Sequence, residues 1–127
     1  IENCVHEDIA YLPWSPLATG ALTGKYLQGA RPAGTRWTLL QRHGLFRDTK
    51  QSEQAVLAYQ AIAKRHQISL ATLALAWVNQ VDGVTSTIIG ATSIEQLSEN
   101  VQAYSTPLSA ELIAEIDQAL KLHSAPY

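Results

Sequence analysis

The stretch VTSTIIGATSIEQLSENVQA, at residues 84–103, places a strand signal directly before a helix signal. Residues 84–89 are β-branched at most positions, which favours a strand, and Gly90 interrupts that pattern. A helix is predicted from Ser93 to the end of the stretch, because this serine can cap its N-terminus and Gln96 stands in the capping-box position three residues later. A strand that leads into a helix in this way is typical of α/β proteins.

A second strand is predicted upstream of this stretch. The apolar run IAYLPW, at residues 9–14, follows charged residues and indicates a strand buried on both faces, as in a parallel sheet. Serines that can cap helices stand at the start of three amphipathic patterns, which predict helices at residues 52–66, 69–81 and 109–122. This order of elements indicates parallel strands joined by right-handed crossovers. Because parallel strands belong in larger sheets, we expect further strands from elsewhere.

Residues 15–51 are predicted to form one long loop. They contain five of the seven glycines, and no helical or strand period persists through them. Six basic residues stand there against one acidic residue, namely Lys25, Arg31, Arg36, Arg42, Arg47 and Lys50 against Asp48. This local excess of positive charge suggests an anionic ligand, although a solvated basic loop explains it equally well.

The overall composition is that of a globular chain without a strong net charge. Of its 127 residues, 46% are hydrophobic and 16% are charged, and the formal net charge is -2. A weakly acidic chain of this kind is not expected to bind nucleic acid or an anionic membrane. Its single cysteine, Cys4, suits a reducing compartment, so we expect a cytoplasmic protein. Because the sequence contains no methionine, we expect it to be a piece of a longer polypeptide.

Several common catalytic and binding motifs do not occur in the sequence. The segment GALTGKY, at residues 20–26, departs from the phosphate-binding P-loop in its glycine spacing and in the tyrosine that follows the lysine. No GxGxxG or GxSxG pattern occurs, and the spacing of the four histidines and one cysteine matches no common metal site. We therefore expect neither a Rossmann-type nucleotide fold nor a metal centre.

The residues that follow the two predicted strands are the candidate ligand site. Small and hydroxyl-bearing residues stand at 15–20 and at 90–93, and parallel α/β proteins bind ligands at the carboxyl ends of their strands. The second segment leads into a helix N-terminus, whose free N–H groups and dipole favour a phosphate. An ordinary strand-to-helix turn with a good cap explains the same residues.

The segments WSPLATGALTGKY, at residues 14–26, and STIIGATSIEQLSENVQA, at residues 86–103, closely resemble the C-terminal portion of aldo-keto reductases. The resemblance covers essentially the whole chain and is nearest to the branches that contain bacterial NADPH-dependent reductases and potassium-channel β subunits. It implies an α/β fold in which the chain is the C-terminal part of a (β/α)8 TIM barrel. Residues 9–14 would be strand seven of that barrel, and residues 84–89 would be strand eight.

The resemblance also implies a nicotinamide dinucleotide cofactor. Residues 1–127 would be a single partial domain in which residues 15–51 form a loop that covers this cofactor. NADP(H) is the expected cofactor. NAD(H) stays open as the alternative, because no lysine or arginine between Gly90 and Asn100 is available to pair with the 2′-phosphate of NADP(H). The matched residues are Trp14, Ser15, Pro16, Leu17, Ala18 and Thr19 at the nicotinamide and pyrophosphate, Lys25 and Arg36 across the pyrophosphate, and Gly90, Thr92, Gln96, Glu99 and Asn100 at the adenosine end.

For Trp14 the resemblance implies a particular contact, and for Gln96 and Ala18 a structural role is the alternative to cofactor binding. Trp14 would stack on the nicotinamide ring. Gln96 can instead close the capping box of its helix, and Ala18 can serve packing alone.

The family's catalytic residues have no counterpart in this chain. The tetrad of Asp, Tyr, Lys and His, in which Tyr donates the proton, comes from the first half of the barrel. We therefore expect a cofactor-binding portion of an enzyme that reduces small carbonyl compounds, without catalytic competence of its own. The alternatives are a nucleotide-sensing or interaction subunit of the channel-β type and a truncated chain that binds a partner or is inert. An open barrel edge further predicts self-association.

Overall fold

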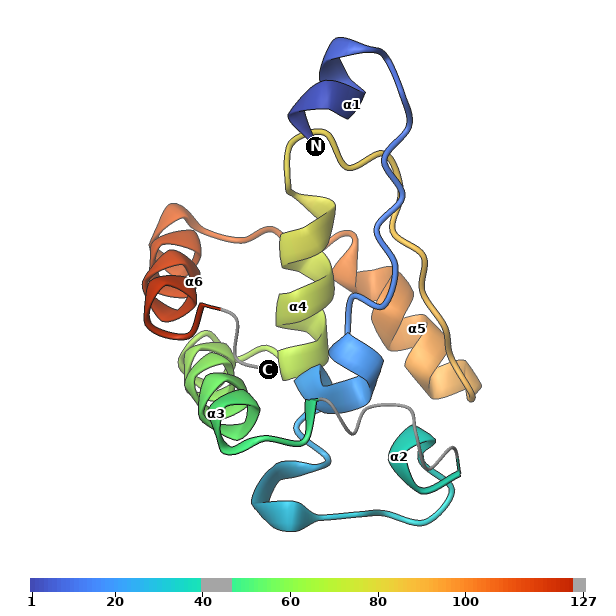
Figure 1. The fold of residues 1–127 in the computed structure, drawn as a ribbon, viewed down its shortest axis with the longest axis vertical. Helices are drawn as coiled ribbons and strands as arrows, with labels where there is room; N and C mark the ends of the chain where they lie inside the picture. The colour runs from blue at the N-terminus through green and yellow to red at the C-terminus, as the bar shows by residue number, and fades with distance from the viewer. Residues whose placement is uncertain (40–46, 125–127) are drawn as a thin grey trace.

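The computed structural model describes residues 1–39 and 47–124. Within these residues the regular structure is helical, and none of the helices is long and apolar enough to cross a membrane. In chain order the helices are α1 (Glu2–His6), the 3₁₀ helices η1 (Ala18–Thr23) and η2 (Leu27–Gly29), α2 (Arg36–Leu39), α3 (Lys50–Arg65), α4 (Leu70–Asn79), α5 (Ile94–Ala103) and α6 (Ala110–Leu122) (Figure 1).

Serine caps begin three of the longer helices, as predicted. Ser69, Ser93 and Ser109 precede α4, α5 and α6, and each hydroxyl accepts a hydrogen bond from the backbone N–H three residues later. The fourth predicted cap is wrong, because Thr49 rather than Ser52 caps α3 and accepts from the Ser52 N–H. Such caps are each worth about 1 kcal/mol, so local side chains set where these helices start.

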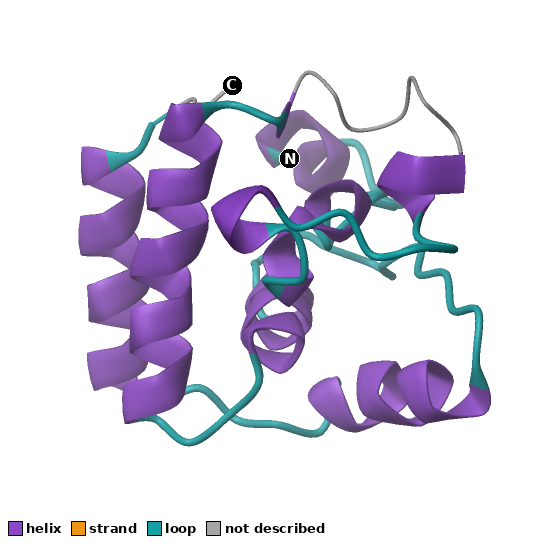
Figure 2. Cartoon of the chain, turned by 90° about the horizontal axis from the view of Figure 1, so that it is seen from below, coloured by secondary structure: helices purple, strands orange, loops and turns teal. Residues whose placement is uncertain are grey.

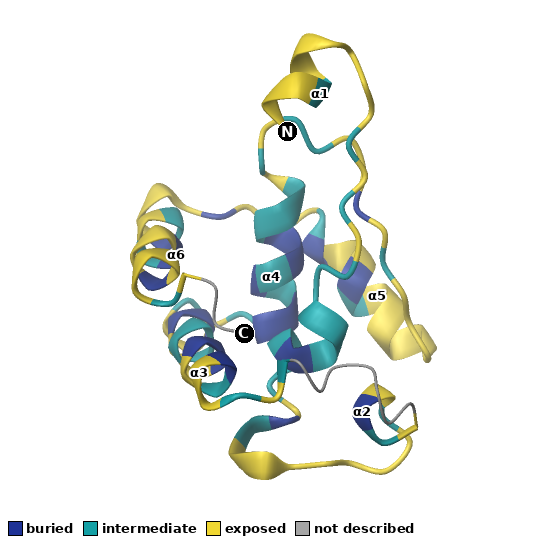
Figure 3. Cartoon of the chain, viewed as in Figure 1, coloured by how far each residue is buried: buried dark blue, intermediate teal, exposed yellow. Residues whose placement is uncertain are grey.

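The hydrophobic core lies between α3, α4 and α6, with α4 nearest the centre (Figures 1 and 3). Figure 2 shows α3 and α6 side by side along the outside of α4. The prediction that the helix at 69–81 is largely buried is confirmed, since α4 contributes five buried residues, namely Leu70, Ala71, Leu73, Leu75 and Ala76. The apolar stripes of the flanking helices complete this core with Val56, Ile62 and Ala63 from α3 and Leu112 and Ile116 from α6.

The two predicted strands lie side by side but do not form a named strand pair within the described residues. One parallel bridge joins Trp14 to Ile88, and the N–H of Thr85 donates to the carbonyl of Tyr11 at 2.9 Å. The Tyr11 N–H donates to the Thr85 hydroxyl rather than to a carbonyl, and Pro13 has no N–H to donate. The expectation of two regular strands is therefore wrong, because too few ladder bonds form between these segments.

The expectation that the first strand is buried on both faces is also wrong. Ile9, Leu12 and Trp14 are exposed, as is Ile88 on the second segment. A parallel pair is normally covered by helices on both faces and by further strands at its edges, and the described residues place neither over these side chains. The extended pair thus leaves an apolar surface uncovered.

The segment at 15–51 contains more regular structure than predicted. It includes η1, η2 and α2, and its last two residues already belong to α3. Residues 40–46, which include the basic Arg42, lie outside the described residues. The expected long loop is therefore a chain of short helical turns across its described parts.

Candidate functional site

The two candidate ligand segments begin at the same end of the extended pair. Besides the bridge between Trp14 and Ile88, the N–H of Ile88 donates to the carbonyl of Pro13 at 2.9 Å. Because the two segments run in the same direction, both continue from the same end of the pair, and the chain then leads to η1 in one case and to α5 in the other (Figure 1). The carboxyl ends of parallel strands are where α/β proteins bind ligands. Both segments therefore start beside the bridge between Trp14 and Ile88.

The first segment has a tightly turned and strained backbone. Ser15, Ala18 and Thr19 have φ angles of 57°, 50° and 58°, a left-handed region that costs a non-glycine residue about 1–2 kcal/mol. The Ser15 hydroxyl accepts the Thr19 N–H at 3.1 Å, and its carbonyl accepts the Ala18 N–H at 2.8 Å. Backbone strain of this kind gathers at ligand sites, so the geometry supports this segment as a site candidate.

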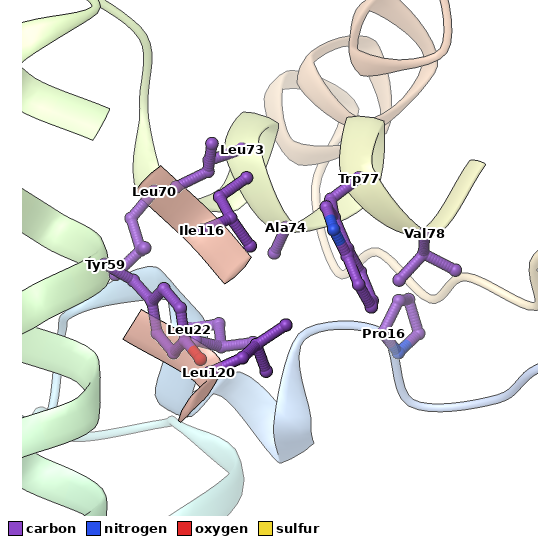
Figure 4. A pocket seen from close by; sticks show the side chains of 10 residues that line it. All are labelled: Pro16, Leu22, Tyr59, Leu70, Leu73, Ala74, Trp77, Val78, Ile116 and Leu120. Carbon is purple, nitrogen blue, oxygen red and sulfur yellow. The ribbon is translucent and has the colours of Figure 1, made fainter. Parts of the chain in front are cut away.

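Trp14, Pro16 and Leu17 have different surroundings. Trp14 is 79% exposed, so its indole presents a flat apolar surface to solvent beside the strained turn. Pro16 is partly buried next to Val78 of α4, in the wall of a cavity (Figure 4). Leu17 is partly buried as well. The cofactor roles assigned to these three residues stay predictions.

The second segment is held by hydrogen bonds within its own residues. Asn100 is 4% exposed, and its side-chain amide donates to the carbonyl of Gly90 at 3.4 Å. The Gln96 side chain accepts from both the backbone N–H and the hydroxyl of Thr92, at 3.0 and 3.1 Å. The capping box is therefore only half formed, because Gln96 reaches Thr92 instead of the N–H of the cap Ser93. Asn100 thus contacts Gly90 and Gln96 contacts Thr92, and their roles at the adenosine end stay predictions.

Two glutamates shape the electrostatics at this end of α5. Glu99 accepts a hydrogen bond from the hydroxyl of Ser69, which caps α4, so its carboxylate links α5 to α4. Glu95 is exposed in the first turn of α5, and hydrogen bonds from its own backbone N–H and from the Ser93 hydroxyl lower the pKa of its carboxyl below the usual value. This carboxylate already occupies donors that a phosphate would use, which the sequence analysis did not consider.

The two predicted basic contacts are exposed and stand away from the second segment. The Lys25 ammonium lies 5.3 Å from the centre of the Tyr26 ring, and Arg36 is the first residue of α2. In the described part of the chain, no hydrogen bond or ion pair joins Lys25 or Arg36 to residues 14–19 or 90–100. Figures 1 and 2 together show α2 well separated from α5. The structure therefore does not bring these cations against the second segment.

An aromatic stack that the sequence analysis missed lies directly beside these cations. The rings of Tyr26 and Trp37 stack with centroids 4.0 Å apart and planes at 8°. Arg31 lies over the Trp37 ring at 5.1 Å and forms an ion pair with Asp48, which neutralises part of the basic excess. The available sequence signal was two aromatic residues on either side of a Gly- and Pro-rich turn.

The titratable groups elsewhere do not form a metal site in the described residues. No three His, Cys, Asp or Glu side chains there lie close enough to hold a metal ion. Glu115 of α6 accepts hydrogen bonds from Arg65 and His66 at the end of α3, and these hydrogen bonds hold the pKa of its carboxyl below the usual value. The cluster connects two outer helices, which is a structural role.

Comparisons with known proteins identify the family of this chain. The model of the aldo/keto reductase family matches residues 1–121. Protein tas of Escherichia coli K12 is 40% identical over 121 residues, which are 95% of this chain and 35% of that protein. A probable voltage-gated potassium channel subunit beta of Arabidopsis thaliana is 35% identical over 118 residues, which are 87% of this chain and 36% of that protein.

An NADH-specific methylglyoxal reductase of Escherichia coli K12 is 34% identical over 123 residues, which are 93% of this chain and 36% of that protein. The chain thus spans about a third of the length of these relatives. The family is one of (β/α)8 barrels and of oxidoreductases. The match over nearly all of its residues shows that the chain belongs to the aldo/keto reductase family.

Proposed function

We propose that residues 1–127 form the C-terminal, cofactor-holding part of a (β/α)8 barrel that transfers a hydride between a nicotinamide dinucleotide and a small carbonyl compound. The parallel pairing of Trp14 with Ile88 carries this proposal, because it matches two neighbouring barrel strands with their carboxyl ends together. The strained turn after Trp14 and the hydrogen-bonded segment after Ile88 supply the two halves of the site.

Different residues of this chain are proposed to contact different parts of the cofactor. Trp14 would stack on the nicotinamide through its exposed indole, and residues 15–19 would lie along the nicotinamide and pyrophosphate. Gly90, Thr92, Gln96, Glu99 and Asn100 would hold the adenosine end. Lys25 and Arg36 would cross the pyrophosphate, which requires the stretch from Lys25 to Arg36 to move towards α5 when the cofactor binds.

NADP(H) is the proposed cofactor, with NAD(H) as the alternative. The basic excess in residues 15–51 supports a highly charged nucleotide, whereas residues 90–100 contain no lysine or arginine for a 2′-phosphate. One relative is named as NADH-specific, so both forms belong in any binding test. The bound nucleotide supplies the hydride, and this chain's residues bind and orient it.

Acid–base chemistry is proposed to come from outside this chain. The family's Asp, Tyr, Lys and His tetrad has no match in the 127 residues, so the chain would bind nucleotide without turning over a carbonyl substrate. We place the protein in the cytoplasm, as its single cysteine suggests. The exposed Ile9, Leu12 and Ile88 would be covered by further barrel strands and would otherwise promote self-association.

A second candidate is a nucleotide-sensing or interaction subunit. The 35% identity to a protein named as a probable potassium channel subunit beta favours it. Nucleotide binding alone does not separate the two candidates, because both need the same nucleotide clamp. An intact tetrad in the remainder of the polypeptide would favour the reductase. A tetrad that is missing there would favour the sensing role.

Calorimetric titration with NADPH and NADH tests the nucleotide clamp in the polypeptide that contains these residues. Arg36→Ala removes a charge-assisted contact and is expected to weaken binding about tenfold. Lys64→Ala is the matched control, because it removes one exposed positive charge from α3 and is expected to leave the affinity unchanged. Equal affinities in both variants and the wild type would contradict the proposed role of Arg36.

Turnover assays test whether the catalytic residues lie outside residues 1–127. Residues 1–127 alone are expected to give no carbonyl-dependent NADPH oxidation with small aldehydes. Measurable turnover by this chain would show that it carries its own catalytic residues.

A further inference from the structure

A cavity of about 160 Å³ lies between η1, α3, α4 and α6, and Pro16 of the proposed nucleotide clamp lies at one edge of its wall (Figure 4). Leu22 of η1, Leu73 of α4 and Ile116 of α6 line it, and the last two are almost fully buried. Leu120 of α6 also lines the cavity but is 38% exposed, so the cavity opens to solvent near this residue. Every lining residue belongs to this chain.

The walls combine two aromatic faces with a single free hydroxyl. Tyr59 of α3 and Trp77 of α4 present their rings to the same space (Figure 4). Within the described residues the Tyr59 hydroxyl forms no hydrogen bond, and Figure 4 shows it near Leu120. Burial raises the pKa of this hydroxyl above its usual value of 10.0, so it is protonated and able to donate at neutral pH.

The size and chemistry of the cavity define its ligand. The volume is close to that of an engineered apolar cavity that binds benzene. An aromatic ring gains further stabilisation from offset or edge-on contact with other rings. A charged ligand is disfavoured, because the lining residues offer no opposite charge to replace its lost hydration.

We propose that this cavity binds a neutral, single-ring aromatic molecule that carries one hydrogen-bond acceptor, with the Tyr59 hydroxyl as its donor. The proposal assigns a second site to the chain and stands independently of the nucleotide function.

Three probes of similar size test the ligand chemistry on the chain of residues 1–127. Anisole carries an ether oxygen, ethylbenzene has no acceptor, and benzoate is charged. Titrations followed by amide proton–nitrogen NMR spectra are expected to shift signals in η1, α3, α4 and α6 with anisole and ethylbenzene but not with benzoate. Anisole is expected to bind about 2- to 10-fold more tightly than ethylbenzene, as one hydrogen bond implies. Tyr59→Phe should abolish this difference and leave the affinity for ethylbenzene unchanged.

Filling the cavity tests its location. Ala74 lies on α4 between Ile116 and Trp77 in the cavity wall, so Ala74→Phe should block both neutral probes (Figure 4). Ala114→Phe places the same ring on the exposed face of α6 and is the matched control. Far-UV circular dichroism checks that each variant is folded, and Ala74→Leu serves as a smaller filler if the phenylalanine variant unfolds.

Three results would overturn the proposal. The first is that neither neutral probe binds the folded chain at millimolar concentration. The second is that Ala74→Phe, or Ala74→Leu if that variant is used, binds the probes as tightly as Ala114→Phe does. The third is that NADPH displaces anisole competitively, because that would make the cavity part of the nucleotide site. Failure of nucleotide binding by itself leaves all three probe measurements intact and would contradict only the proposed function.

Discussion

Replacement of Trp37 tests whether an aromatic stack positions the two basic residues of the proposed clamp. Lys25 directly precedes Tyr26, and Arg36 directly precedes Trp37. The 4.0 Å stack of the two rings therefore holds together two backbone segments that each carry a predicted pyrophosphate contact. Without the indole, these segments lose the ring stack and keep only the hydrogen bond from the residue 37 N–H to the Tyr26 hydroxyl, so we expect both lower stability and weaker nucleotide binding from Trp37→Ala.

The size of the effect follows from burial and hydrogen bonding at Trp37. Its side chain is 8% exposed and belongs to the core, so alanine is expected to cost about 3–5 kcal/mol of unfolding free energy. The indole N–H is buried without a partner in the described residues, a state that costs about 1–3 kcal/mol. Trp37→Phe removes that unmet donor along with part of the ring. We therefore expect it to stay within about 1 kcal/mol of the wild type.

Urea denaturation followed by circular dichroism measures the stability, and calorimetric titration with NADPH measures the binding. Trp14→Ala is a control for stability, because this exposed tryptophan should change the unfolding free energy by no more than about 0.5 kcal/mol. A Trp37→Phe variant as unstable as Trp37→Ala would refute the reasoning about the unmet donor. A Trp37→Ala variant that loses stability but keeps full nucleotide affinity would refute the positioning role of the stack.

The remaining predictions concern substitutions of Glu95 and Glu115, which are expected to change nucleotide affinity and the pH dependence of stability, respectively. Glu95→Gln removes a negative charge that competes with phosphate at the α5 N-terminus. Calorimetric titration at low salt should therefore show an affinity for NADPH about two- to fivefold higher than that of the wild type. An unchanged affinity would mean that the nucleotide does not reach this end of the helix. The pKa of Glu115 is lowered in the folded chain, so its stabilising effect is present above the unfolded value and is lost as the pH falls through the folded value. Glu115→Gln should therefore flatten the fall of the urea midpoint on acidification, and a curve identical to the wild type would contradict this.

Helix positions were predictable because the relevant interactions are local. Ser69, Ser93 and Ser109 cap their helices as predicted, since an N-cap hydroxyl needs only a backbone N–H three residues away. The error at Ser52 has the same local origin. Thr49 is an equally good capping residue that stands three residues earlier, so the helix begins there and uses the Ser52 N–H as the bonded donor.

The candidate site was predictable only in part. Gly90, Thr92, Gln96 and Asn100 lie within eleven residues along the start of one helix, so their proximity follows from the chain itself. Glu99 belongs to the same stretch, yet its carboxylate accepts from Ser69, thirty residues away. No local pattern encodes that partner.

The sequence by itself determined the four longer helices, three of their caps, the apolar stripes and the two segments that mark the aldo/keto reductase family. Only the tertiary structure decided that Trp14 pairs with Ile88, that Tyr26 stacks on Trp37, and that α3, α4, α6 and η1 enclose an apolar cavity. Caps and stripes depend on neighbours three or four residues apart, which the chain always holds close. Pairings across 11 to 74 residues form only when packing repays the entropy of closing the loop between them.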